Sequence, residues 1–187
     1  MHGANAGNPD VPLPPTLRAW EDFYAHASLP RPILEPVEGQ SIPEPYRRLL
    51  VHNGDMTPAL ESFHAGAIHL EVLRSKLDGN RYERDVVLRM NGSHKPVEFG
   101  AIEIDLSVVG AAARKEILEA HKPLGAILRD FAIAHLSRPK AFVRLQSDPI
   151  INASLQLAGP LTLYGRRNTL LLPDGRTLAE IVEILPP

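Results

Sequence analysis

Three consecutive segments between residues 67 and 106 carry apolar residues at every second position, and they constrain the fold more than any other feature. A period of two is the pattern of a β-strand with one buried face. The sequences "DGNR" and "NGSHKP" between the segments are typical of tight turns. The expected inward residues of the first and third segments are Ile68, Leu70 and Val72, with Arg74 next in line, and Ile102, Ile104 and Leu106. Strands joined by short turns pair in antiparallel order, so this region predicts an antiparallel meander.

Helical and strand patterns on either side of the meander indicate an α+β protein. Residues 29–45 contain five prolines and predict an irregular connector. We expect a helix after "NGDM", with Thr57 as its N-cap and Pro58 at the first helical position. The other expected helices are 17–27, 45–52, 110–120 and 125–134, and the other expected strands are 142–145, 153–157, 161–172 and 177–185. The fold class is therefore α+β, with about six antiparallel strands and with helices gathered on one face or end of the sheet.

Length and composition exclude several classes of protein. The 187 residues are 44% hydrophobic and 22% charged, which fits one domain at 16–187 after a loose tail at 1–15. A net charge of −2 gives no broad attraction to nucleic acid or anionic lipid, so we expect neither as a partner. No apolar run reaches the roughly 18 residues of a membrane span, and the N-terminus lacks the pattern of a secretory signal. Cysteine is absent, which excludes thiolate chemistry and fits a cytoplasmic location.

The middle strand segment, "RYERDVVLRM", places an arginine on an otherwise apolar face. The residues of that parity are Tyr82, Arg84, Val86, Leu88 and Met90, whereas the opposite parity is mostly polar. A guanidinium keeps its proton, so a buried arginine requires a carboxylate of the protein or an anionic ligand. A structural ion pair with a nearby Asp or Glu and an arginine that reaches water at the sheet rim are the alternatives to a ligand. The same ambiguity applies to Arg74.

The C-terminal hairpin adds four charged residues, Arg166, Arg167, Glu180 and Glu183. Strand parity does not decide which glutamate faces inward, because each parity contains one. A cross-strand salt bridge is the structural alternative, above all for Glu180. An inward glutamate beside an inward arginine would instead form an acid–base pair in a water-poor pocket.

Other common site motifs are missing from the sequence. There is no G-x-G-x-x-G, no G-x-x-x-x-G-K-[ST] and no G-x-S-x-G. His64 and His69 lack the spacing of a helical zinc pair, and no His, Asp or Glu cluster has convincing ligand spacing, so we expect no metal. Basic residues interleaved with aromatics, the mark of a single-stranded nucleic-acid surface, are missing as well.

Five segments resemble, in order and spacing, the chorismate–pyruvate lyase family, whose members remove pyruvate from chorismate to give 4-hydroxybenzoate. The segments are "LLVHNGDMT" (49–57), "RYERDVVLRMNG" (81–92), "KPLGAIL" (122–128), "LYGRRNTLLL" (163–172) and "EILPP" (183–187). Together they span residues 45–187, and they are most similar to the divergent branch of the family. The resemblance implies a chorismate lyase-like fold, in which a highly twisted antiparallel sheet is covered by helices and helical flaps around a ligand cavity.

The resemblance also implies site residues for a carbon–oxygen lyase without a cofactor. The family's substrate-binding arginine falls on Arg84, which would hold a ligand carboxylate. The family's active-site glutamate falls on Glu183 if the "PDGR" hairpin has one added residue, and on Val182 if it does not. These two residues are the expected catalytic pair, and the expected ligand-binding residues are Met56 of a flap, Leu124 through a backbone group, Arg166 of "YGRR", and Arg84 itself.

Two alternatives to this lyase stay open. The same fold serves as the ligand-sensing domain of bacterial transcription regulators, so the protein could bind an aromatic acid without chemistry. About 40 residues precede the matching region, and they are weakly basic and rich in proline, so we expect no DNA-binding module in them. The second alternative is a lyase with a related substrate or another hydroxybenzoate as product. The segment 137–160 is longer than in the compact enzymes, which leaves pocket size and substrate open, and the sequence does not define an oligomeric state.

Overall fold

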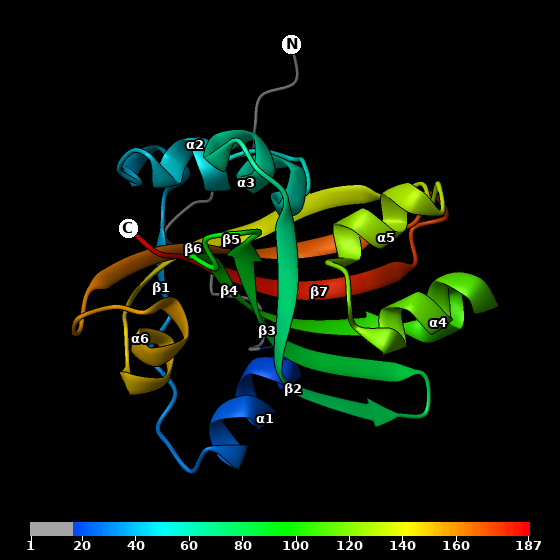
Figure 1. The fold of residues 1–187 in the computed structure, drawn as a ribbon, viewed down its shortest axis with the longest axis horizontal. Coiled ribbons are helices and arrows are strands. Elements are labelled where there is room, and N and C mark those ends of the chain that lie inside the picture. Colours follow the sequence, from blue (N-terminus) through cyan, green and yellow to red (C-terminus); the bar gives the residue numbers. More distant parts are fainter. Residues whose placement is uncertain (1–16) are drawn as a thin grey trace.

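The computed structural model describes residues 17–187, which build one antiparallel sheet of seven strands with helices packed against it (Figure 1). The strands are β1 (Glu35–Val37), β2 (Ile68–Asp78), β3 (Arg81–Met90), β4 (Pro96–Asp105), β5 (Leu136–Gln146), β6 (Thr162–Leu171) and β7 (Thr177–Leu185). The helices are α1 (Arg18–His26), α2 (Tyr46–Leu50), α3 (Met56–His64), α4 (Ala111–Glu119), α5 (Leu124–Asp130) and α6 (Pro149–Leu155). The predicted α+β class is confirmed, with seven strands in place of about six. The loose tail expected at 1–15 lies outside the described residues.

The sheet has the strand order β1-β5-β6-β7-β4-β3-β2, and each neighbouring pair is antiparallel. β2, β3 and β4 form the expected meander. The C-terminal hairpin of β6 and β7 then joins this meander, because β7 pairs with β4. This topology places the glutamates of β7 two strands from Arg84, and the arginines of β6 three strands from it.

The register of the first hairpin shifts at a β-bulge between Val72 and Arg74. A bulge inserts one extra residue and reverses the facing of the residues that follow it. The sequence pattern placed Arg74 next in the inward row, but after the bulge Arg74 faces the other side of the sheet. It lies opposite Asp85 and donates a hydrogen bond of 2.7 Å from its Nε to that carboxylate.

The predicted strand at 153–157 is wrong, because residues 149–155 form α6. The Asp148 side chain accepts a hydrogen bond of 2.8 Å from the backbone N–H of Ile151, and Pro149 occupies the first turn. An N-cap followed by proline is a strong helix start. The expected N-cap at Thr57 is also wrong, since α3 begins at Met56 and its N-cap is Asp55.

Helices cover both faces of the sheet, whereas the sequence pattern suggested one face or end. α1 and α6, in the lower part of Figure 1, pack on one face, and α2 to α5 pack on the other. The first core includes Trp20, Tyr24, Phe99, Ile151, Val182 and Ile184. The opposite face is covered through Leu50, Leu60, Leu88, Ile102, Ile117 and Ile127. Within the described residues, no helix has both the length and the apolar character that crossing a membrane would require.

Candidate functional site

A glycine in the middle of the sheet opens a pocket beneath α3 and α5. One row across the sheet runs from Val86 on β3 to Gly100 on β4 and on to Glu183 on β7. Because Gly100 has no side chain, the row has a gap between its two neighbours. A Cβ at this position would lie 3.2 Å from Oε1 of Glu98 and 3.3 Å from Cγ2 of Val86. The floor of the pocket is therefore space that only glycine leaves free.

The first residues of two helices form the roof of the pocket. Asp55, Met56 and Thr57 contribute from the start of α3, and Pro123, Leu124 and Gly125 from the start of α5. A Cβ on Gly125 would lie 3.5 Å from Oγ1 of Thr57, so the two helix starts are in near contact. The pocket is partly open to solvent and has a volume of about 60 Å³, which is room for a few water molecules.

Arg84 lines this pocket as a buried cation that no carboxylate within residues 17–187 neutralises. Its relative exposure is 2%, and its Nε and Nη1 atoms have no hydrogen-bond partner in that range. Burial lowers the pKa of Arg84 to about 10, while the Tyr82 hydroxyl acts in the opposite direction. The side chain therefore remains charged at neutral pH. Among the described residues neither structural alternative holds, since Arg84 forms no salt bridge and does not reach water at the sheet rim.

Glu183 lines the same pocket and is held from behind by Arg166. The Arg166 Nε donates to the Glu183 carboxylate. Its Nη1 donates to the carbonyl oxygens of His52 at 3.0 Å and Leu50 at 3.4 Å, and its Nη2 donates to that of Gly54 at 3.1 Å. Arg166 is fully buried and lies outside the pocket lining. It positions Glu183 and the backbone that leads into the roof.

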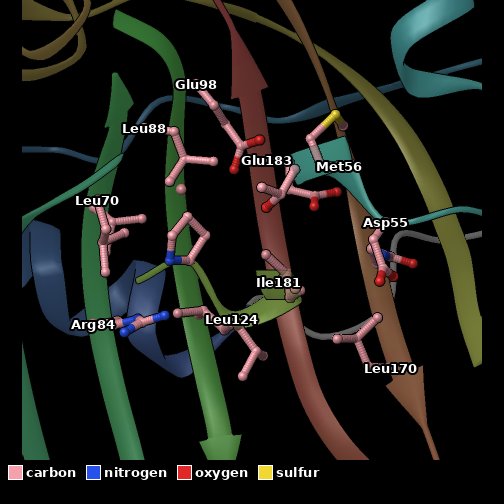
Figure 2. Close-up of a pocket in the computed structure, with 17 residues that line it drawn as sticks. Asp55, Met56, Leu70, Arg84, Leu88, Glu98, Leu124, Leu170, Ile181 and Glu183 are labelled. Atoms are coloured by element: carbon pink, nitrogen blue, oxygen red, sulfur yellow. The ribbon is translucent and has the colours of Figure 1, made fainter. Parts of the chain in front are cut away.

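A second glutamate, Glu98 on β4, lies next to Glu183 in the pocket. Its exposure is 5%, and its Oε2 has no hydrogen-bond partner among the described residues. Burial raises the pKa of Glu98 well above its usual range, the negative charge of Glu183 raises it further, and Arg166 opposes them. Figure 2 shows the carboxyl groups of Glu98 and Glu183 in one part of the pocket and the guanidinium of Arg84 in another. The pocket thus has a cationic end and an acidic end, separated by apolar side chains.

Asp55 in the roof is paired with a histidine outside the lining. The Nε2 of His135 lies 2.9 Å from Oδ2 of Asp55, and its Nδ1 lies 2.9 Å from the carbonyl oxygen of Ile133. The pair ties the start of α3 to the segment before β5. Asp55 is therefore already engaged within the protein, unlike Arg84.

Four of the five residues proposed from the sequence lie together in the pocket: Arg84, Glu183, Met56 and Leu124. Arg166 lies behind Glu183 instead. The sequence analysis did not identify Glu98. A signal for it existed, since Glu98 has the same strand parity as the inward residue Ile102. The sequence also left the choice between the two C-terminal glutamates open. The structure turns Glu183 inward, whereas Glu180 accepts a hydrogen bond of 2.9 Å from Thr169.

Comparisons with solved structures give likenesses at low sequence identity. The effector domain of PhnF from Mycobacterium smegmatis superposes with a TM-score of 0.55 at 12% identity, over 73% of this chain and 90% of that domain. PhnF from the same organism gives 0.53 at 12% identity, over 72% of this chain and 64% of PhnF. YydK from Bacillus subtilis, a possible transcriptional regulator, gives 0.50 at 13% identity, over 64% and 58% of the two chains.

These likenesses show the fold and nothing finer. The chain spans 58% of the length of YydK and 64% of that of PhnF. No family model matches the sequence, and no curated protein matches it. Membership of the chorismate–pyruvate lyase family therefore remains a prediction from the sequence segments.

Proposed function

We propose that the protein binds a small ring compound with a carboxylate group in this pocket, as a binding or sensing protein. The observation that carries the proposal is the guanidinium of Arg84, which is buried and charged beside an apolar cavity and has no carboxylate partner in the part of the chain that the structure describes. A ligand carboxylate would neutralise the charge and accept two parallel hydrogen bonds from the unpartnered nitrogens. Binding without chemistry is also in line with the fold neighbours, among them an effector domain and a possible transcriptional regulator.

The rest of the lining suits a flat carbocyclic acid. Leu70, Val86, Leu88, Ile102, Leu170 and Ile181 supply the apolar walls. The start of α3 lies over the cavity, and the first turn of a helix favours negative charge. Because the pocket has room for only a few water molecules, a bound ring compound would require the roof at 55–57 and 123–125 to move outward.

The test is calorimetry with 4-hydroxybenzoate as the probe. We expect binding by the wild type and a loss of at least about 30-fold in affinity for Arg84→Met, because removing one partner of a buried charge pair costs 2–5 kcal/mol. Arg81→Met is the matched control, since Arg81 lies on the same strand, pairs with Glu103 at 3.0 Å and is not in this pocket. Unchanged affinity in Arg84→Met would overturn the proposal.

A second candidate function is the elimination of pyruvate from chorismate, favoured by the position of Glu183 in the same pocket as Arg84. The reaction converts chorismate into 4-hydroxybenzoate and pyruvate as the C–O bond of the enolpyruvyl ether breaks and the ring becomes aromatic. Arg84 would fix a substrate carboxylate, and Glu183 would contact the ring hydroxyl or move the proton. No step in this scheme uses a metal or an organic cofactor.

Incubation with chorismate separates the two candidates. Release of pyruvate above the rate without protein, lost in Glu183→Gln, would identify a lyase. Tight binding of 4-hydroxybenzoate without pyruvate release would identify a binding protein. Chromatography of the ring product would show whether a different hydroxybenzoate is formed.

A further inference from the structure

The geometry points to Glu98 as a specificity-determining residue that donates a hydrogen bond to an oxygen of the bound ring acid, at the end of the pocket away from Arg84. This inference rests on the proposed binding function. Glu98 lies outside the five segments that resemble the lyase family, and it takes part in no salt bridge among the described residues. The ligand class predicted by this inference is a ring acid with an oxygen substituent across the ring from the carboxylate.

The position of the Glu98 carboxyl group is fixed by the strands around it. Glu98 lies opposite Leu88 on β3 and two residues before Gly100, whose missing side chain opens the pocket. Its Oε1 lies 3.2 Å from where a Cβ of Gly100 would stand, so the carboxyl group covers the gap. Its Oε2 is buried and has no hydrogen-bond partner within residues 17–187. A polar atom held in that way is available to a ligand in the pocket.

Among the residues that the structure describes, Glu98 forms no salt bridge, and Arg166 is a nearby cation that only partly offsets the negative charge of Glu183. Glu183 faces it from β7 and adds a negative charge, whereas Asp55 in the roof is paired with His135. Arg166 directs its hydrogen bonds to Glu183 and to backbone carbonyls. Arg84 lies at the other end of the pocket (Figure 2), and the start of α5 contributes no titratable side chain to the lining. A carboxyl group in such a place keeps its proton, and burial and Glu183 raise its pKa accordingly.

A protonated Glu98 beside an ionised Glu183 offers one donor and one acceptor. The oxygen of a ring hydroxyl can accept from Glu98 and donate to Glu183. A ring acid without that oxygen would leave the donor of Glu98 buried and unpaired, which is unfavourable. The pocket should therefore prefer 4-hydroxybenzoate to benzoate.

The test compares the affinities of 4-hydroxybenzoate and benzoate for three proteins. We expect a preference of about tenfold or more in the wild type, the size of one lost hydrogen bond to a buried group. Glu98→Gln keeps a donor of the same shape and should keep most of the preference. Glu98→Met removes the donor and should reduce the preference by about tenfold. A Glu98→Met protein with the wild-type preference would overturn the inference.

Infrared spectroscopy reports directly on the protonation of Glu98 and on its contact with the ligand, which a purely structural role would not affect. The experiment uses the conservative variant Glu98→Gln, so it does not depend on the folding of Glu98→Met. The spectrum of the wild type at neutral pH minus that of Glu98→Gln should contain the C=O stretch of a protonated carboxyl group. The buried Asp85, with a pKa of about 7, contributes the same band to both spectra and cancels in the difference. Addition of 4-hydroxybenzoate should shift this band, and benzoate should shift it less. A spectrum in which Glu98→Gln removes no such band would overturn the inference.

Failure of this inference and failure of the proposed function give different results. If neither probe binds the wild type in a way that depends on Arg84, the binding function itself is wrong. If both probes bind and need Arg84 but Glu98→Met leaves their ratio unchanged, only the role of Glu98 is wrong.

Discussion

Arg84 shows a conflict between stability and function within one residue. A buried charge without a counter-ion destabilises the folded state, because desolvation removes its favourable interaction with water. The nitrogens Nε and Nη1 make no compensating hydrogen bonds to the residues that the structure describes. A side chain that opposes folding and lines a cavity is better explained by a ligand than by structure.

The first prediction follows from that conflict. Arg84→Met should raise the free energy of unfolding of the unliganded protein by about 1–4 kcal/mol, because an apolar side chain of similar length replaces an unpaired charge. Urea denaturation measures the change. The same variant should gain no stability from 4-hydroxybenzoate, whereas the wild type gains it by mass action.

Arg81→Met is the matched control for the change in stability. It removes an arginine of the same strand that pairs with Glu103. We expect a change within about 0.5 kcal/mol there, as for most surface ion pairs. A clear loss of stability in Arg84→Met would mean that Arg84 has a structural partner after all.

At the residue scale, the sequence predicted the facing of Arg84 but not that of Arg74. Period two gives the correct face as long as the register is continuous, and β3 is continuous from Arg81 to Leu88. The bulge after Val72 reverses the facing of the strand that follows, and no residue type in that stretch marks it. Glu98 was not predicted because the inward row of β4 was assigned only from Ile102 onward. Extending that row toward the start of the strand gives Gly100 and then Glu98.

At the element scale, helix α1 explains why the other face of β3 is buried although it is mostly polar. Arg74 links that face to the helix, since its Nε donates to Asp85 at 2.7 Å and its Nη2 donates to the carbonyl oxygen of Ala19 at 3.2 Å. Lys76 pairs with Asp22 of the same helix at 2.9 Å. Asp85 is fully buried, and its Oδ1 has no hydrogen-bond partner in the described part of the chain. The docking of α1 therefore depends on a carboxyl group in a poorly solvated place.

The second prediction is a pH dependence of stability that comes from Asp85. Burial raises the pKa of Asp85 from 3.8 to about 7, and Arg74 opposes the shift. Between these two values the folded state holds a proton that the unfolded state has lost, so the free energy of unfolding falls as the pH rises from about 4 to 7. The full effect of a shift of this size is on the order of 4 kcal/mol.

Asp85→Asn should flatten this slope, because asparagine does not titrate. Urea denaturation at several pH values between 4 and 8 measures it. Asp174→Asn is the control, since Asp174 pairs with Arg176 in an exposed turn at 2.7 Å. A slope in Asp85→Asn equal to that of the wild type would contradict the prediction.

Element types followed the sequence where the pattern was long and failed where it was short. The strands of the meander and the C-terminal hairpin each have nine or more residues and were predicted. β1 has three residues inside the proline-rich connector and exists through its pairing with β5, a contact that local sequence does not contain. α6 was read as a strand from its apolar residues, although Asp148 and Pro149 mark a helix start.

At the scale of the whole molecule, Arg166 joins the sheet to the roof of the pocket. Its guanidinium bonds to Glu183 on β7 and to the carbonyl oxygens of His52 and Gly54, just before the roof residue Asp55. A ligand that contacts Glu183 would therefore act on the same network that holds the roof closed. This connection between distant segments could not be predicted from "YGRR", because it depends on the packing of α2 and its following loop over β6.

The third prediction concerns this network. Arg166→Met should lower the free energy of unfolding by about 3–5 kcal/mol, because it leaves the carboxylate of Glu183 buried without its partner. The double variant Arg166→Met with Glu183→Met should be more stable than the single variant, since it removes the unpaired charge as well. Urea denaturation of the three proteins measures both effects.

Hydrogen exchange should also show faster opening of residues 51–55 in both variants than in the wild type, because both lose the hydrogen bonds to the roof segment. Equal stability of the single and double variants would show that Arg166 acts through the roof carbonyls alone, and unchanged exchange at 51–55 would show that the roof is held by other contacts.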